Sequence, residues 1–375
     1  MKILVHSTDF LPNDGGAAVF VHNICLQLCR LGHQVDVLTL VRDNSDAIDQ
    51  KQPYRVFRYS TFKRLASLVP MMKVLSLHHR NHYDLIFAGH FGTTCFIGEI
   101  ILKKVFNIPF VVLSHGNDVW KFSINTYLDK IFARMVFNNS SLILANSNFT
   151  AKRILEMGYK IKIKILWPGV DENQFHPNVS CTEVRSKYDL VGKKVLLTVV
   201  RLVPVKNVGN VLKALCKVVE QVPEVRYLVV GDGPVRDQLE KHRDELGLHA
   251  YVYFLGNVEH EQLPMFYCAS DVFVMPSCKT KGAVETFGIS LIEASACGKP
   301  VIGGQSGGIV EAVINGKTGL LVDPDNSDDI ASAIIQLLTD QEFAAQLGQN
   351  GRERIERELS WDKMGEKLGK YLESI

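Results

Sequence analysis

Two glutamates, Glu285 and Glu293, stand eight positions apart on either side of a glycine step and an apolar, helix-forming run. Gly288, between them, can occupy a turn that a side chain would block. A helix that begins just after Gly288 leaves backbone N–H groups unpaired at its start, and its partial positive charge favours a phosphate there. This suits a ligand with phosphate in the middle and hydroxyl groups at both ends, such as a nucleotide-sugar. Because two glutamates at this spacing also occur by chance, the rest of the chain has to support the interpretation.

Basic and glycine-rich loops in the second half of the chain give that support. Arg201 and Lys206 are two cations five positions apart, ahead of a predicted helix. A diphosphate needs such charges because its leaving-group charge must be neutralised as the bond to the sugar breaks. The turn Gly231-Asp232-Gly233-Pro234 lets backbone approach a ligand, and Leu255-Gly256-Asn257-Val258 offers backbone groups that can contact the edge of a base. The alternative for the two cations is a basic loop in solvent.

Each of these loops follows a predicted strand. Short apolar runs predict strands at 194–200, 226–230, 252–255, 271–275 and 300–302, and helices at about 208–222, 235–246, 262–270 and 288–297. Such alternation predicts a doubly wound parallel sheet. Ligands of these sheets lie beyond the carboxyl ends of the strands, so we expect the four loops to converge at one edge.

The first half repeats the pattern. Strands are predicted at 2–6, 34–40, 55–58, 84–88, 110–114, 141–145 and 162–166, with helices between most of them. The chain is therefore expected to be α/β, with two Rossmann-like doubly wound domains. Three loops at strand ends hold candidate site residues, namely Gly15 and Gly16, His90, and His115 with Asn117 and Asp118. The first loop lacks the GxGxxG pattern, and each histidine has the alternative of a turn residue that bonds local backbone.

The length and composition fit two globular domains. The chain has 375 residues, 46% apolar and 22% charged, which is too long for one ordinary domain. Pro168-Gly169 punctuates the middle, so we expect domains at 1–168 and 169–356 and a final amphipathic helix within 357–375 that returns to the first domain. No run approaches the ~18–20 apolar residues of a spanning helix, and the start is too quickly polar for a signal peptide. Eight scattered cysteines without a CxxC pair fit a reduced, cytoplasmic protein.

Charge is distributed unevenly. Residues 1–168 carry 20 Lys and Arg against 11 Asp and Glu, whereas residues 169–375 carry 22 against 29. A basic first half suggests an anionic partner. Residues 62–82 interleave basic and apolar side chains, which is typical either of a segment in a membrane interface or of ordinary surface helices with a solvated basic face. We expect the basic half to make a peripheral contact with anionic membrane at the inner face of the cell membrane. Nucleic acid is not expected as a partner.

Taken together, these motifs resemble the retaining glycosyltransferases of family 4, which have the GT-B architecture of two facing Rossmann-like domains. The resemblance spans nearly the whole chain. Its motifs are Gly15-Gly16, Gly32-His33, His115-Gly116, Pro168-Gly169-Val170-Asp171, Arg201 with Lys206, Gly231-Asp232-Gly233, Phe254-Leu255-Gly256 and the Glu285–Glu293 element. Residues 201–204 and 274–277 look similar to the bacterial branch that contains phosphatidylinositol mannosyltransferases.

The resemblance implies roles for these residues. Arg201 and Lys206 would hold the donor diphosphate, helped by the amides near Gly288 and Ile289. Glu285 would bond the hydroxyls of the sugar, and Glu293 those of the ribose. Gly16 would face the diphosphate across the cleft, and His115 would line the acceptor side. The set of catalytic and donor-binding residues that it implies is Gly15, Gly16, His115, Arg201, Lys206, Gly231, Gly233, Leu255, Asn257, Val258, Glu285, Phe287, Gly288, Ile289 and Glu293, with His90, Asn117 and Asp118 as acceptor-side candidates.

The expected function is transfer of a hexose from a GDP- or UDP-linked sugar to a glycan or lipid-linked acceptor of the cell envelope, with retention at the anomeric carbon. No cofactor and no metal are expected, because Arg201 and Lys206 would take the place of a cation. Asp323-Pro324-Asp325 resembles a metal-binding DxD motif but is interpreted as a turn. The alternatives are a non-catalytic module that binds sugar-nucleotide or glycan, and a dinucleotide-dependent oxidoreductase.

Overall fold

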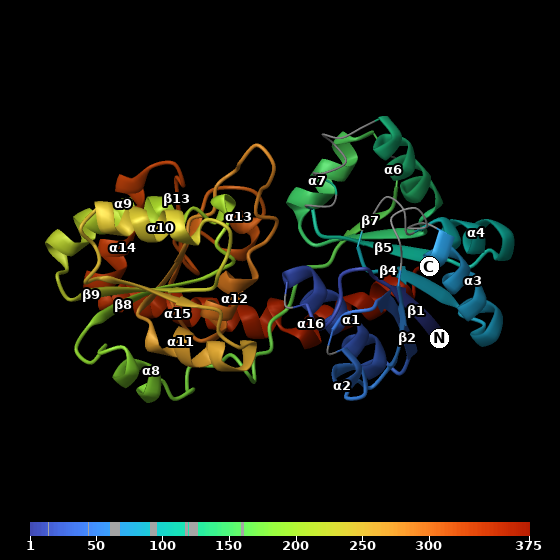
Figure 1. Cartoon of the computed structure of the whole chain (residues 1–375), viewed down its shortest axis with the longest axis horizontal. Coiled ribbons are helices and arrows are strands. Elements are labelled where there is room, and N and C mark those ends of the chain that lie inside the picture. Colours follow the sequence, from blue (N-terminus) through green and yellow to red (C-terminus); the bar gives the residue numbers. More distant parts are fainter. Residues whose placement is uncertain are drawn as a thin grey trace. The chain divides into compact units, whose positions relative to one another are not determined.

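The computed structural model of the chain describes residues 1–13, 15–43, 45–60, 68–90, 96–116, 119, 127–158 and 161–375. The chain forms two compact units (Figure 1). The first unit consists of Met1–Gly169 together with Trp361–Ile375, and the second of Val170–Ser360. The chain therefore crosses between the units twice, at Gly169/Val170 and at Ser360/Trp361.

A seven-stranded parallel sheet forms the centre of the first unit, in the order β3-β2-β1-β4-β5-β6-β7. The strands are β1 (Lys2–His6), β2 (Gln34–Leu40), β3 (Arg55–Tyr59), β4 (Leu85–Ala88), β5 (Phe110–Ser114), β6 (Leu142–Ala145) and β7 (Ile163–Ile165). Alternate strand residues fill two separate cores, because successive side chains point to opposite faces. Ile3 and Val5 belong to one core, and Leu4 to the other. Helices must therefore cover both faces.

The helices of the first unit are α1 (Gly16–Arg30), α2 (Ser45–Asp49), α3 (Leu68–Asn81), α4 (Ile97–Phe106), α6 (Tyr127–Asn139), α7 (Asn148–Glu156) and α16 (Trp361–Leu372). The last of these, α16, lies beside α1 at one face of the sheet (Figure 1). Met364, Leu368 and Leu372 are buried there with Ile24 and Leu28 of α1. The final helix of the chain is thus part of the core of the first unit.

The second unit contains a six-stranded parallel sheet in the order β10-β9-β8-β11-β12-β13. Its strands are β8 (Lys194–Val199), β9 (Val225–Val230), β10 (Val252–Gly256), β11 (Val272–Met275), β12 (Val301–Gly304) and β13 (Leu320–Val322). The order reverses between β8 and β11, as it does between β1 and β4 in the first sheet. Such switch points are where ligands bind in open α/β sheets.

Helices α8 (Thr182–Lys187), α9 (Val208–Gln221), α10 (Arg236–Glu245), α11 (Leu263–Ala269), α12 (Ile289–Ala296), α13 (Ile309–Ala312), α14 (Ser327–Thr339) and α15 (Gln341–Arg354) accompany this sheet. Short helical turns occur at Pro204–Lys206 and His260–Gln262, and a π-turn at Ile355–Leu359 leads towards α16. The predicted fold class is confirmed. The three-residue strand β13 was not predicted. Among the described residues, no helix has the length and apolarity needed to span a bilayer.

Candidate active site

The loops after β8, β9, β10 and β11 lie at the carboxyl edge of the second sheet and bond to one another. Leu202 N–H donates to Asp232 O at 2.8 Å, and Gly231 N–H donates to Gly256 O at 2.7 Å. Cys278 N–H, from the loop after β11, donates to Val205 O at 2.9 Å. The predicted convergence of the four loops therefore has a backbone basis.

Glycine is required where the β9 loop presses on the β8 loop. Gly231 has a φ of +118°, and a Cβ built on it would lie 1.9 Å from Val200 O. A Cβ on Gly233 would lie 2.3 Å from Leu202 O. The two loops can touch through their backbones only because both positions are glycine. Glycine likewise lets backbone come close to a ligand.

Lys206 and Glu285 form an ion pair between the loop after β8 and the loop after β11. Their side chains are only 18% and 17% exposed. Asn207, which has a left-handed φ of 60°, fixes the position of Lys206. Its amide donates to Pro276 O at 3.0 Å and to Pro324 O at 2.6 Å. The fold therefore brings together a cation and a carboxylate that the sequence separates by 79 positions.

Arg201, the other predicted cation, is exposed. Its guanidinium makes no hydrogen bond or ion pair with any residue in the described part of the chain. Lys206 and Arg201 thus share a loop but differ in environment. The first is tied to a carboxylate, and the second is available to an anionic ligand.

The helix start predicted at Gly288 is present. Gly288 caps α12 with a φ of +96°, and no side chain caps the helix. A Cβ on Gly288 would lie 2.9 Å from Leu291 Cδ1 and 3.0 Å from Met275 Cε. Phe287, the residue before Gly288, is buried. Leu291 N–H donates to Gly288 O at 3.1 Å, and the start of α12 before it, at Ile289 and Ser290, has no side-chain cap. A helix start of this kind is an arrangement that can bind phosphate.

Glu293 lies in the body of α12 and is 7% exposed. Tyr267 Oη donates to its Oε2 at 2.7 Å, and His260 Nε2 lies 3.4 Å from its Oε1. The hydrogen bond to Glu293 is the main reason why the pKa of His260 is raised. Glu285 is thus held by a cation, whereas Glu293 is held by a hydroxyl and a ring nitrogen.

Two glycines that sequence reasoning did not single out support the Glu285 loop. Gly308 N–H donates to Glu285 O at 2.9 Å. A Cβ on Gly308 would lie 1.8 Å from Thr286 O, and one on Gly307 would lie 2.1 Å from Glu285 O. The run Gly303-Gly304-Gln305-Ser306-Gly307-Gly308 at the end of β12 was the available signal, since two glycine pairs after a strand indicate close backbone approach.

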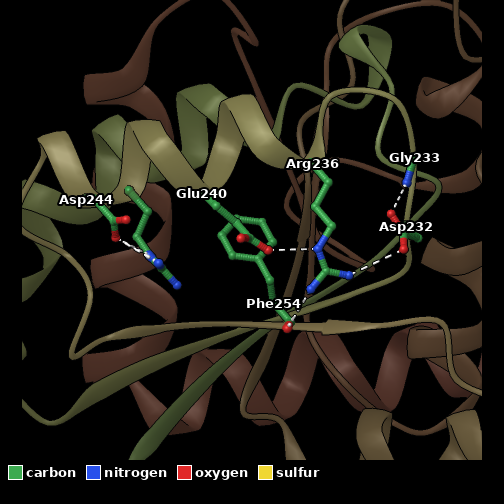
Figure 2. Close-up of polar contacts among 7 residues, drawn as sticks. Asp232, Gly233, Arg236, Glu240, Asp244 and Phe254 are labelled. Atoms are coloured by element: carbon green, nitrogen blue, oxygen red, sulfur yellow. Dashed lines mark hydrogen bonds and ion pairs between the residues drawn. The ribbon is translucent and has the colours of Figure 1, made fainter.

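Leu255, Asn257 and Val258 surround the end of β10, where the ladder shifts register between Phe254 and Gly256. Arg236, which was not predicted, braces this edge from α10 (Figure 2). Its guanidinium bonds Glu240 at 2.7 Å, Asp232 at 3.4 Å and Phe254 O at 3.3 Å. The loop that carries Asp232 and Gly233 is thereby tied to the loop that is expected to meet the base.

In the first unit, His90 and His115 both lie at the carboxyl edge of the sheet. His115 Nε2 lies 2.9 Å from Gly89 O, to which it donates, and His90 Nε2 lies 2.9 Å from Thr8 Oγ1. Gly15 caps α1 and Gly16 is its first residue. Asn117 and Asp118 lie outside the described residues. Within the described part of the chain, no group of three or more His, Cys, Asp or Glu is placed to hold a metal ion.

Comparisons with known proteins agree with this geometry. The sequence profile of "Glycosyltransferase Family 4" matches residues 14–174, and that of "Glycosyl transferases group 1" matches residues 182–354. A GDP-mannose-dependent alpha-(1-6)-phosphatidylinositol monomannoside mannosyltransferase of Mycolicibacterium smegmatis is 30% identical over 99% of this chain and 98% of its own length. The chain belongs to glycosyltransferase family 4. The predicted family, and with it a transferase activity, is confirmed, and the oxidoreductase and binding-module alternatives are set aside.

Another relative of this family 4 glycosyltransferase has a name that specifies a different substrate, and two solved structures share the fold. N-acetyl-alpha-D-glucosaminyl L-malate synthase of Bacillus anthracis is 26% identical over 97% of this chain and 95% of its own length. The crystal structure of HepE from Anabaena with UDP and glucose matches with a TM-score of 0.84 at 23% identity, covering all of both chains. Sucrose-phosphate synthase from Thermosynechococcus elongatus matches at 0.83 and 24%, covering 100% of this chain and 98% of the other. These structures confirm the GT-B fold.

Proposed function

We propose that this glycosyltransferase moves a hexose from a GDP- or UDP-linked sugar to a lipid-linked or glycan acceptor of the cell envelope, with retention at the anomeric carbon. The observation that carries the proposal is the Lys206–Glu285 ion pair at the glycine-lined edge of the second sheet. GDP-mannose is the first donor to test, since the name of the Mycolicibacterium smegmatis relative specifies it. The first unit is proposed as the acceptor side.

The donor diphosphate gains negative charge as the bond to the sugar breaks. Arg201 and Lys206 supply two positive charges from one loop, and the uncapped start of α12 supplies N–H groups. Such prearranged charge stabilises a leaving group without solvent reorganisation. Protein groups thereby provide the charge that a divalent metal ion provides in other transferases, so the proposed reaction is independent of metal.

Lys206 bonds one carboxylate oxygen of Glu285, and the side chains in the described part of the chain leave the other oxygen without a partner. In the proposal this carboxylate bonds hydroxyls of the transferred sugar. Retention follows from attack of the acceptor hydroxyl on the same face from which the diphosphate departs. A phosphate oxygen of the donor takes the acceptor proton in this scheme, and His115 lines the acceptor side.

A surface of the first unit supports a lipid-linked acceptor. Helices α3 and α4 pack closely at Gly98, where an added Cβ would lie only 3.1 Å from Met71 Cα. Together they expose four apolar side chains, Leu68, Met72, Val105 and Phe106, at 48–67%, next to exposed Lys73, Arg80 and Lys104. We call this set the α3–α4 surface. Its mixture of apolar and basic groups fits the interface of an anionic membrane at the cytoplasmic face.

The proposal is tested by incubating the enzyme with GDP-mannose, UDP-glucose or UDP-N-acetylglucosamine and phosphatidylinositol-containing lipid. Released nucleoside diphosphate, the mass of the product and its anomeric configuration by NMR are measured, with and without EDTA. We expect transfer from one donor, an α-linked product and unchanged rates in EDTA. A β-linked product would overturn retention, loss of activity in EDTA would overturn metal independence, and no transfer from any donor would overturn the substrate class.

A further inference from the structure

His260 is the most exposed of the groups that contact Glu293. It lies in the short helical turn after β10, with its side chain 44% exposed, whereas the side chain of Glu293 is 9% exposed. The His260 ring therefore borders the solvent-facing side of a carboxylate that is otherwise enclosed. The carboxylate oxygens have separate partners, since His260 faces Oε1 and Tyr267 faces Oε2.

The hydrogen bonds around His260 define how its ring is oriented. The side-chain amide of Gln174 lies 3.5 Å from Nδ1, and it also donates to the backbone carbonyl of His260 at 3.2 Å. With Nδ1 accepting from Gln174, the ring proton of neutral His260 is on Nε2, where it points at Glu293. The Phe175 ring packs edge-on against both His260 at 5.3 Å and Tyr267 at 5.8 Å, and so keeps both donors in place. The other charged groups that act on His260 are Glu261 and Asp171, which are both acidic.

An ionised carboxylate has about four acceptor positions. His260 and Tyr267 occupy one on each oxygen of Glu293, and no other side chain among the described residues occupies the second position on either oxygen. One position on each oxygen is therefore left for a ligand. Two adjacent acceptors on a fixed carboxylate match two adjacent hydroxyl groups. A ribose carries such a diol, and a 2′-deoxyribose does not.

We propose that His260 is a positioning residue that orients Glu293 for the ribose diol of the donor nucleotide, an inference that rests on the proposed function because Glu293 must meet the ribose. The alternative is a surface histidine that only helps α12 to pack. The two differ in a measurable way, since a packing role affects every ligand equally, whereas a positioning role affects only ligands that carry the diol.

The test measures binding of GDP and UDP, and of their 2′-deoxy counterparts, by isothermal titration calorimetry. For the wild type we expect at least a roughly tenfold preference for the ribose form of the nucleotide that binds, since a hydrogen bond to a charged group is involved. In His260→Ala the preference should fall below about threefold, with the affinity for the 2′-deoxy form changed less than about twofold. His260→Gln should restore much of the preference, because its amide can donate to Glu293.

His249→Ala is the matched control, because His249 also lies 3.4 Å from a carboxylate, that of Asp244, but is 79% exposed. It should behave like the wild type. Tyr267→Phe removes the other donor to Glu293 and should lower the preference as His260→Ala does. It is the second variant to measure if His260→Ala does not fold.

The outcomes separate this inference from the function on which it rests. If Glu293→Gln abolishes the ribose preference but His260→Ala keeps it, the role of His260 is refuted and Glu293 stays at the ribose. If the wild type shows no preference, the ribose does not meet Glu293 and the inference falls while hexosyl transfer stands. If neither nucleotide binds, the proposed donor class fails as well.

Discussion

At the scale of single residues, the two cations of the β8 loop have unequal structural roles. Lys206 neutralises a carboxylate that is 17% exposed, whereas Arg201 has no partner in the described part of the chain. Removing Lys206 therefore leaves the largely buried Glu285 charge without its counter-ion, which is costly. Removing Arg201 leaves no protein charge unpaired.

We expect Arg201→Ala and Lys206→Ala each to lower kcat/KM by about 10²–10³, the usual cost of losing a group that stabilises transition-state charge. Only Lys206→Ala should also lower stability, by about 1–3 kcal/mol. Steady-state kinetics and thermal melts check both expectations. Lys241→Ala, at an exposed ion pair with Glu245, is the control and should change neither quantity.

A double variant sharpens this prediction. Lys206→Ala combined with Glu285→Ala removes both charges, so it should melt at a higher temperature than Lys206→Ala alone while staying inactive. If the double variant is no more stable than the single one, the destabilisation does not arise from the unpaired carboxylate. Equal destabilisation by Arg201→Ala would count against the unequal roles of the two cations.

At the scale of elements, the proposed donor site depends on loops that contact one another and not on the sheet alone. Gly307 and Gly308, in the loop after β12, lie against the loop after β11, which carries Glu285. Gly308 has an ordinary negative φ. This position therefore requires glycine because a side chain would not fit, and not because of its backbone conformation. The position of Glu285 is therefore set by the backbone of a neighbouring strand loop.

Gly308→Ala should displace the Glu285 loop, because its Cβ would lie 1.8 Å from Thr286 O. We expect a loss of about 1–3 kcal/mol of stability, the usual cost of overpacking, and a fall of at least about tenfold in kcat/KM, which corresponds to ~1.4 kcal/mol of barrier. Gly282→Ala lies earlier in the same β11–α12 connection, with nothing within 4 Å of the added Cβ. It should leave both melting temperature and rate unchanged. A Gly308→Ala variant with unchanged stability and rate would refute the role of Gly308 in positioning the Glu285 loop.

The elements themselves were largely predictable from the sequence. Buried parallel strands are continuous apolar runs, and the rule that their carboxyl ends share an edge predicted that the β8 to β11 loops would meet. The sequence did not predict which residues of those loops contact one another in the folded protein. The glycine run that ends at Gly308 indicates a close backbone approach but does not say that the loop of Glu285 is what it meets, and His260 meets Glu293 across 33 positions. Strand β13 was not predicted either.

At the scale of the whole molecule, the charge asymmetry of the sequence follows the division into units. The first unit contains the whole basic half of the chain, residues 1–168, and the second unit contains most of the acidic half. The α3–α4 surface adds exposed apolar side chains to the basic unit, and His78 and Phe106 contact each other across its two helices at 5.6 Å. These features underlie the proposal that the first unit contacts anionic lipid.

We expect the protein to co-sediment with anionic liposomes several-fold more than with neutral ones, and this difference to shrink at high salt because screening weakens electrostatic attraction. Met72→Glu with Phe106→Glu should lower the binding. Val191→Glu, at a 74%-exposed apolar position of the second unit, should not. Binding that is equally strong at high salt, or indifferent to the α3–α4 variants, would contradict this docking mode.

The placement of α16 has a consequence for how the protein is made. The second unit is one continuous stretch, Val170–Ser360, but the first needs Trp361–Ile375 to finish. Domains fold as they leave the ribosome at about 5–20 residues per second, so the apolar stripe of α1 waits roughly 17–70 s for the helix that covers it. The half that is synthesised first is therefore completed last. During that interval Ile24 and Leu28, buried in the finished protein, are a natural target for a chaperone that shields nascent chains.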